Sequence, residues 1–151
     1  MLDPEESLGY QCSLTFRAFQ AALEARFKAA GFGPAQLVAL AHLIAAGKLS
    51  QAELAARLGV SAPAAHGLVA RMAREGWLRL GALRTDRRVN LVAPTPKARR
   101  AWEELSPTLR ALLDEAYHGI PEAELRLAHA VLKRVRENLA RTRPRPREER
   151  P

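Results

Sequence analysis

The sequence predicts a mainly α-helical fold with one short β-hairpin. Of its 151 residues 48% are apolar, mostly alanine and leucine, and only 5% are aromatic. This composition favours helices over a β-sandwich. Apolar side chains recur every three or four residues over most of the chain, and they alternate only between Trp77 and Thr95. The first period is typical of amphipathic helices and the second of strands.

Long helices are expected on both sides of a central region. Residues 5–30 carry an apolar stripe and form the first helix, and Pro34 opens a second helix that ends at Gly47. After the central region, Thr95 caps a helix that runs to about residue 119, and a last helix spans 121–141. The first stripe consists of Leu8, Cys12, Phe16, Phe19, Leu23 and Phe27.

Two short helices are expected between Ser50 and Gly76. Ser50 with Glu53 has the spacing of a capping box, Gly59 stops the first helix, and Ser61 caps the second. Two short helices joined by a tight glycine-containing turn indicate a helix-turn-helix. Its second helix places one stripe in the core, formed by Ala65, Leu68, Val69 and Met72.

A basic hairpin follows at once. Two strands flank the loop of residues 81–88, in which Arg84, Arg87 and Arg88 accompany Asp86. In the second strand Val89, Leu91 and Ala93 form the alternating apolar set. A helix-turn-helix followed by such a hairpin predicts a winged helix with a two-stranded β wing, which suits the grooves of DNA.

The charge balance points to the same partner. The net charge is +8, and a polyanion such as double-stranded DNA is the expected ligand. The segment 141–151, expected to be a disordered basic tail, carries five arginines against two glutamates, so +5 remains on residues 1–140.

The segments LSQAELAARLGVSAPAAHGLVARMAREGWLRL and TDRRVNLVAPTPKARRAW resemble the multiple-antibiotic-resistance regulator (MarR) family. The resemblance rests on Asp86, Arg88 and Thr95 at the family's usual spacing. It implies a homodimeric transcriptional regulator, expected to be a repressor, on a pseudo-palindromic operator. Residues 34–105 would form the DNA-binding domain, and 1–33 with 106–140 the helical dimerisation region.

The resemblance also assigns roles in DNA binding. Arg88 would enter the minor groove and Asp86 would orient it, with Arg84 and Arg87 beside them. The second helix of the motif would present a face that is poor in donors, so we expect phosphate and wing contacts to dominate. For Arg71 and Arg74, the alternative to DNA contact is a position on a helix face that only meets solvent. On the exposed face of this second helix, the residues expected to contact DNA are Ser61, Pro63, Ala64, His66, Gly67 and Arg71.

An effector site is the third implication. A small lipophilic or phenolic ligand would bind between the DNA-binding lobe and the dimerisation helices and release the operator. Core packing is the alternative for each residue that would line this crevice. These residues are Phe16, Phe19, Phe32, His42 and Trp102.

Cys12 supports a different hypothesis. A lone cysteine in the first helix resembles the one-cysteine organic-hydroperoxide regulators of the same family, although FGPAQLVAL lacks their tyrosines. A small core residue is the alternative. A single cysteine excludes an internal disulfide and fits the cytoplasm.

Other classes find no support in the pattern. We expect no enzyme, because no nucleophile has a positioned base, and no cofactor. We expect no membrane span and no metal site, because the histidines are scattered. A winged-helix module that binds protein, or that coats DNA with low specificity, remains the rival from another class. The histidines are His42, His66, His118 and His129.

Overall fold

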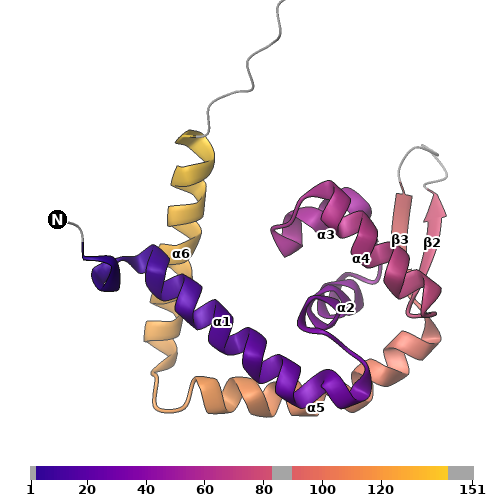
Figure 1. The fold of residues 1–151 in the computed structure, drawn as a ribbon, viewed down its shortest axis with the longest axis horizontal. Coiled ribbons are helices and arrows are strands. Elements are labelled where there is room, and N and C mark those ends of the chain that lie inside the picture. Colours follow the sequence, from indigo (N-terminus) through magenta and orange to yellow (C-terminus); the bar gives the residue numbers. More distant parts are fainter. Residues whose placement is uncertain (1–2, 83–89, 143–151) are drawn as a thin grey trace, which may run out of the picture. The chain divides into compact units, whose positions relative to one another are not determined.

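The computed structural model describes residues 3–82 and 90–142, which fall into two compact units, Met1–Leu112 and Leu113–Pro151. The fold is mainly helical with a small antiparallel sheet, as predicted (Figure 1). The predicted tail, 141–151, lies outside the described residues from 143 onward.

The first long helix is α1, Leu8–Phe27, with short 3-10 helices at Pro4–Glu6 (η1) and Lys28–Ala30 (η2). Only the C-terminal part of its predicted stripe is buried, at Leu23 and Phe27, while the Phe16 side chain is 62% exposed. The stripe is therefore a core face at one end and an exposed apolar surface at the other.

The next helix, α2, spans Pro34–Ala46, as the first-turn proline and Gly47 predicted. It contributes a run of fully buried side chains and packs against α3 (Gln51–Leu58) and α4 (Ala62–Arg74). These three helices and the sheet enclose the core of the first unit (Figure 1). Its largest fully buried side chains are Phe27, Leu37, Leu40, Leu43, Leu54, Val69, Met72, Val92 and Pro94.

The helix-turn-helix has the predicted caps. The Ser50 hydroxyl accepts from the Glu53 amide at 3.2 Å, and the Glu53 carboxylate accepts from the Ser50 amide at 2.7 Å, which completes a capping box. Gly59 ends α3 with φ 66°, a left-handed conformation that costs glycine little.

The sheet has three strands rather than the two expected. β2 (Leu78–Ala82) and β3 (Asn90–Pro94) form the hairpin, and β1 (Leu49–Ser50) pairs with the other edge of β3, in the order β1-β3-β2. All pairs are antiparallel. A strand of two residues has no periodicity to detect, and Ser50 also caps α3.

The buried face of β3 differs from the prediction. Val92 and Pro94 are buried, whereas Leu91 and Ala93 are only half-buried on the opposite face. The reason is tertiary, because α2 packs on β3 and selects which of two apolar sets is covered. Leu80 lies beyond this covered region and is 56% exposed.

Two long helices complete the chain. α5, Pro96–Ala116, begins after Thr95, whose hydroxyl accepts from the Ala98 amide at 3.2 Å, and it continues through Pro107. In the second unit α6, Glu122–Thr142, has no buried side chain. Its apolar residues include Leu127, which is 65% exposed.

Within the described residues, no single helix is long and apolar enough to cross a membrane. Leu8–Ala30 and Pro34–Ala46, which are bent by 83° relative to each other, pass the same test of length and composition only as a pair.

Candidate DNA-binding surface

The two faces of α4 separate as the helical period predicts. Ala65, Leu68, Val69 and Met72 are buried at 8% exposure or less. The opposite face is exposed along its whole length, so it is free to meet a large partner. That face carries Ser61, Pro63, Ala64, His66, Gly67, Arg71 and Arg74.

Ser61 is the N-cap of α4 and lies at the helix N-terminus, where the helix dipole places a positive partial charge. Its Oγ accepts from the Ala64 amide at 3.4 Å, which leaves the hydroxyl hydrogen available to an outside acceptor. A hydroxyl donor beside a helix N-terminus suits a phosphate oxygen.

His66 is held by the preceding helix. Its Nδ1 lies 3.3 Å from Oε1 of Gln51, the first residue of α3. With the proton on Nδ1, the histidine donates to Gln51, and both His66 Nε2 and the Gln51 amide group remain free for a base edge or a phosphate. Gln51 was not among the predicted site residues. Its position directly after the Ser50 cap, at the start of α3, could have indicated that it lies near the second helix of the motif.

The C-terminal end of α4 is tied to α2. Gln36 is buried, with 7% of its surface exposed; its Nε2 donates to Glu75 Oε2 at 2.9 Å, and its Oε1 accepts from the Gly33 amide at 3.0 Å. A carboxylate at a helix C-terminus is unfavourable by itself. The hydrogen bond from the buried Gln36 amide to the Glu75 carboxylate explains why a glutamate is tolerated at this position.

The same end of α4 is also tied to the start of α5. Lys97 Nζ donates to the Glu75 carbonyl at 2.8 Å and lies 3.9 Å from the centre of the Trp77 ring. Thr95 Oγ1 donates to the Gly76 carbonyl at 2.8 Å. Trp77 in turn packs on the buried Phe32 ring at 4.6 Å between centroids. These contacts fix the orientation of α4 against two other helices of the first unit.

The start of the motif carries a carboxyl with a shifted pKa. The backbone hydrogen bond from Ser50, then its side-chain hydrogen bond and the charge of Arg57, hold the pKa of the Glu53 carboxyl below its ordinary value of 4.5. The capping box is therefore complete at neutral pH.

Sequence comparison identifies the domain built from these elements. Residues 30–89 match a family model described as MarR family. Over these residues the chain is similar to the MarR family. No curated protein sequence matches it.

Solved structures match nearly the whole chain. The transcriptional regulator PA3341 is 29% identical with a TM-score of 0.79, and the match covers 89% of this chain and 99% of that one. A mutant MarR from E. coli complexed with operator DNA is 21% identical, with a TM-score of 0.75 and coverage of 85% and 92%. CouR from Rhodococcus jostii RHA1 bound to p-coumaroyl-CoA is 19% identical, with a TM-score of 0.79 and coverage of 89% and 95%. The last two show the shared fold alone.

The wing residues that resemble the MarR signature fall outside the described residues. The structure describes β2 as far as Ala82 and β3 from Asn90, whereas the loop between them carries the predicted groove-binding residues. Their roles stay predictions from the sequence. These residues are Arg84, Asp86, Arg87 and Arg88.

The residues predicted for an effector are distributed unevenly. Phe32 is buried beneath Trp77 and has a packing role, whereas Phe19, His42 and Trp102 are half-buried. None of the five predicted residues lines the hollow formed by Lys48, Arg79, Leu80, Gly81, Leu91 and Ala93. Exposed Phe16 and the others stay candidates from the sequence alone.

Cys12 is half-buried in α1 and its thiol is free. Over the described parts of the chain, histidine, cysteine and carboxylate side chains form no group of three that would hold a metal ion.

Proposed function

We propose that this protein is a homodimeric repressor of the MarR family that binds a pseudo-palindromic operator and is released by a small lipophilic or phenolic ligand. The observation that supports DNA binding most directly is the exposed face of α4, capped by Ser61 and held at its C-terminal end by Gln36 and Lys97. A rigidly held helix with one free face suits the major groove.

The chemistry of that face favours phosphate contacts over base readout. His66, Gln51 and Ser61 offer polar groups, and Arg71 and Arg74 offer charge at the last turn. The remaining positions are small and apolar. We therefore propose that affinity depends strongly on salt and that discrimination between sequences is modest, with the wing adding to it.

The dimer is supported by uncovered apolar surface. The first half of α1 and all of α6 leave apolar side chains exposed, each considered within its own unit. A two-fold dimer would cover such surface and present two reading helices to two half-sites.

The fold comparisons support the partners by analogy. A mutant MarR was crystallised with operator DNA, and CouR with p-coumaroyl-CoA. For this chain a DNA operator and an organic effector are accordingly part of the proposal. A cytoplasmic location, expected from the single cysteine, belongs to it as well.

The deciding experiment titrates two duplexes of equal length, one from upstream of the chain's own gene and one scrambled, at two salt concentrations. We expect a preference for the first duplex and a steep salt dependence of both. Equal binding of both duplexes would instead identify a DNA-coating protein, and binding of neither would favour a protein-binding module.

Two variants separate the roles within α4. Arg71→Ala should weaken both duplexes similarly and reduce the salt slope, whereas His66→Ala should mainly reduce the preference, by about 1–3 kcal/mol at most. Arg110→Ala, which removes an exposed charge on α5, serves as the control. If Arg110→Ala matches Arg71→Ala, α4 is not the reading helix.

The peroxide-sensing alternative is tested separately. Cys12→Ser should bind DNA as the wild type does, before and after peroxide treatment, if Cys12 is a packing residue. A peroxide effect that Cys12→Ser abolishes would replace ligand release by thiol chemistry.

A further inference from the structure

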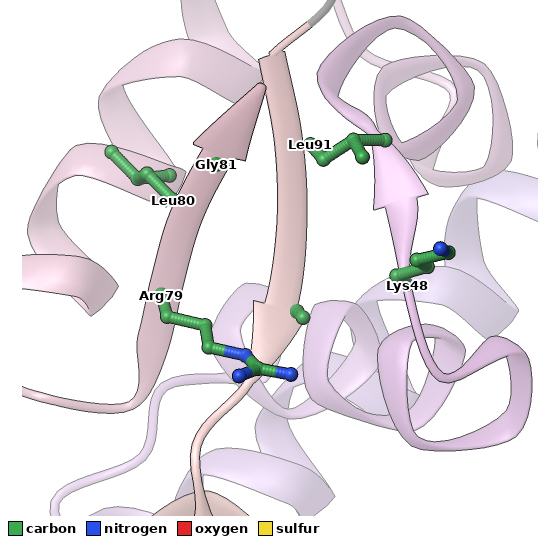
Figure 2. A pocket seen from close by; sticks show the side chains of 6 residues that line it. Lys48, Arg79, Leu80, Gly81 and Leu91 are labelled. Atoms are coloured by element: carbon green, nitrogen blue, oxygen red, sulfur yellow. The ribbon is translucent and has the colours of Figure 1, made fainter. Parts of the chain in front are cut away.

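The outer face of the sheet carries a hollow whose lining includes none of the residues proposed to contact DNA. Its volume is about 230 Å³, and it is lined by Lys48, Arg79, Leu80, Gly81, Leu91 and Ala93. Figure 2 shows Arg79 and Lys48 on either side of the central strand, with Leu91 between β3 and β1.

The register explains why Arg79, Gly81, Leu91 and Ala93 share one face of the sheet. Arg79 pairs with Ala93, and Gly81 pairs with Leu91, so all four stand on the side of the sheet opposite buried Val92. Lys48 precedes Leu49, which pairs with Val92. The lysine therefore alternates to the outer face as well.

The charges at this hollow have no ionic partner among the described residues. Arg79 comes from one edge strand and Lys48 leads into the other, and within residues 3–82 and 90–142 neither makes an ion pair. Two uncompensated cations that flank one depression attract an anion.

The apolar residues at the base of the hollow indicate which kind of anion fits it. Leu91 and Ala93 are half-buried and form an apolar base between the cations, and Gly81 leaves open space where other residues carry a side chain. A phosphate would lose hydration against such a floor, whereas an apolar ring or chain would be covered by it. The volume is below the roughly 300–1,000 Å³ of sites for drug-sized ligands, so the occupant is small.

We infer that this hollow binds a small amphipathic carboxylate, with its carboxylate between Lys48 and Arg79 and its apolar body over Leu91 and Ala93. This site lies on the outer sheet face and shares no residue with the crevice expected to hold an effector. Binding there goes beyond the proposed function and is measured without DNA, so the two fail independently.

The test uses benzoate as the probe and follows amide shifts of the full-length ¹⁵N-labelled protein. We expect saturable shifts at Gly81, Leu91 and Ala93, with a dissociation constant on the order of 1 mM because both cations are exposed. Neutral benzamide and inorganic phosphate should each bind at least about tenfold more weakly, because each lacks one half of the recognition.

Two variants test the location without removing charge. Gly81→Val places a β-favouring side chain in the hollow, where no heavy atom lies within 4 Å of its Cβ, and should abolish benzoate binding. Ala82→Val is the matched control, because the next residue of the strand points to the other face. The control should bind as the wild type does.

The double variant Lys48→Ala with Arg79→Ala tests the charges and should weaken benzoate binding about tenfold. Lys28→Ala with Arg110→Ala, which removes two exposed cations outside the hollow, controls for net charge. Unchanged benzoate binding in Gly81→Val would overturn the inference, as would phosphate binding as tight as that of benzoate. Loss of duplex affinity in the double variant, without any benzoate binding, would make the hollow a DNA backbone contact and overturn it too.

Discussion

Ser50 combines three interactions at the entry to the helix-turn-helix. It belongs to β1, its hydroxyl caps α3, and its amide and hydroxyl both donate to the Glu53 carboxylate, at 2.7 and 2.8 Å. The two residues thus join the edge of the sheet to the first helix of the motif. Their pairing is also the reason that the Glu53 pKa is lowered.

Ser50→Ala should lower the free energy of unfolding by about 1 kcal/mol, the usual cost of losing an N-cap. Because the folded-state pKa of Glu53 is depressed, its contribution is present above pH 4.5 and is lost as the pH falls below that value. Urea unfolding should therefore separate wild type from variant at neutral pH and less so well below pH 4.5. An equal difference at both pH values would show that Glu53 does not take part.

At the scale of elements, α4 is held by side-chain contacts at its C-terminal end, and in its middle it leaves room for another backbone to approach. Gln36 and Lys97 hold its C-terminal end, whereas Gly67 interrupts its exposed face with no side chain. A helix-interior glycine lowers stability, and it also allows another backbone to approach closely. DNA approaching α4 at this position would benefit from the second property.

Gly67→Ala should raise the free energy of unfolding by about 0.5–1 kcal/mol, because a Cβ there meets no atom within 4 Å. If the DNA backbone passes over this point, the same variant should bind duplex DNA more weakly despite its higher stability. Ala70→Gly, on the same exposed face, should lose a similar amount of stability. A stabilised Gly67→Ala with unchanged duplex affinity would place the DNA elsewhere along α4.

At the scale of the whole molecule, association is favoured by apolar side chains that the second unit leaves uncovered. In α6 the ridge that includes Leu127 and Val131 is exposed, at 65% and 39%. Full burial of an exposed side chain of this kind contributes about 1.5–3 kcal/mol, and covering the exposed part of these two contributes a corresponding fraction, which favours association.

Leu127→Lys combined with Val131→Lys should convert the expected dimer to a monomer, because two charges would have to be buried on each side of the two-fold axis. The mass by sedimentation equilibrium is the measurement. Ala130→Lys adds a charge in line with Arg126 and Arg134 one turn away on either side and should remain dimeric. A monomeric wild type would contradict the dimer proposal directly.

Interactions between near neighbours could be predicted from the chain without its structure. The caps at Ser50, Ser61 and Thr95, the stop at Gly59 and the buried stripe of α4 all depend on residues within a few positions of one another. Hydrogen-bond chemistry and the helical period are local, so the order of helices and the exposed face of α4 followed from them.

Contacts between distant segments were decided only by packing. Gln36 meets Glu75 across 39 positions, and Lys97 covers Trp77, although nothing in their spacing indicates either pair. The paired strand β1, the choice of Val92 over Leu91 for the interior and the cations gathered on the outer sheet face arise in the same way. A two-residue strand or a sheet with apolar residues on both faces has no preferred partner until a helix covers one side, and here α2 does so.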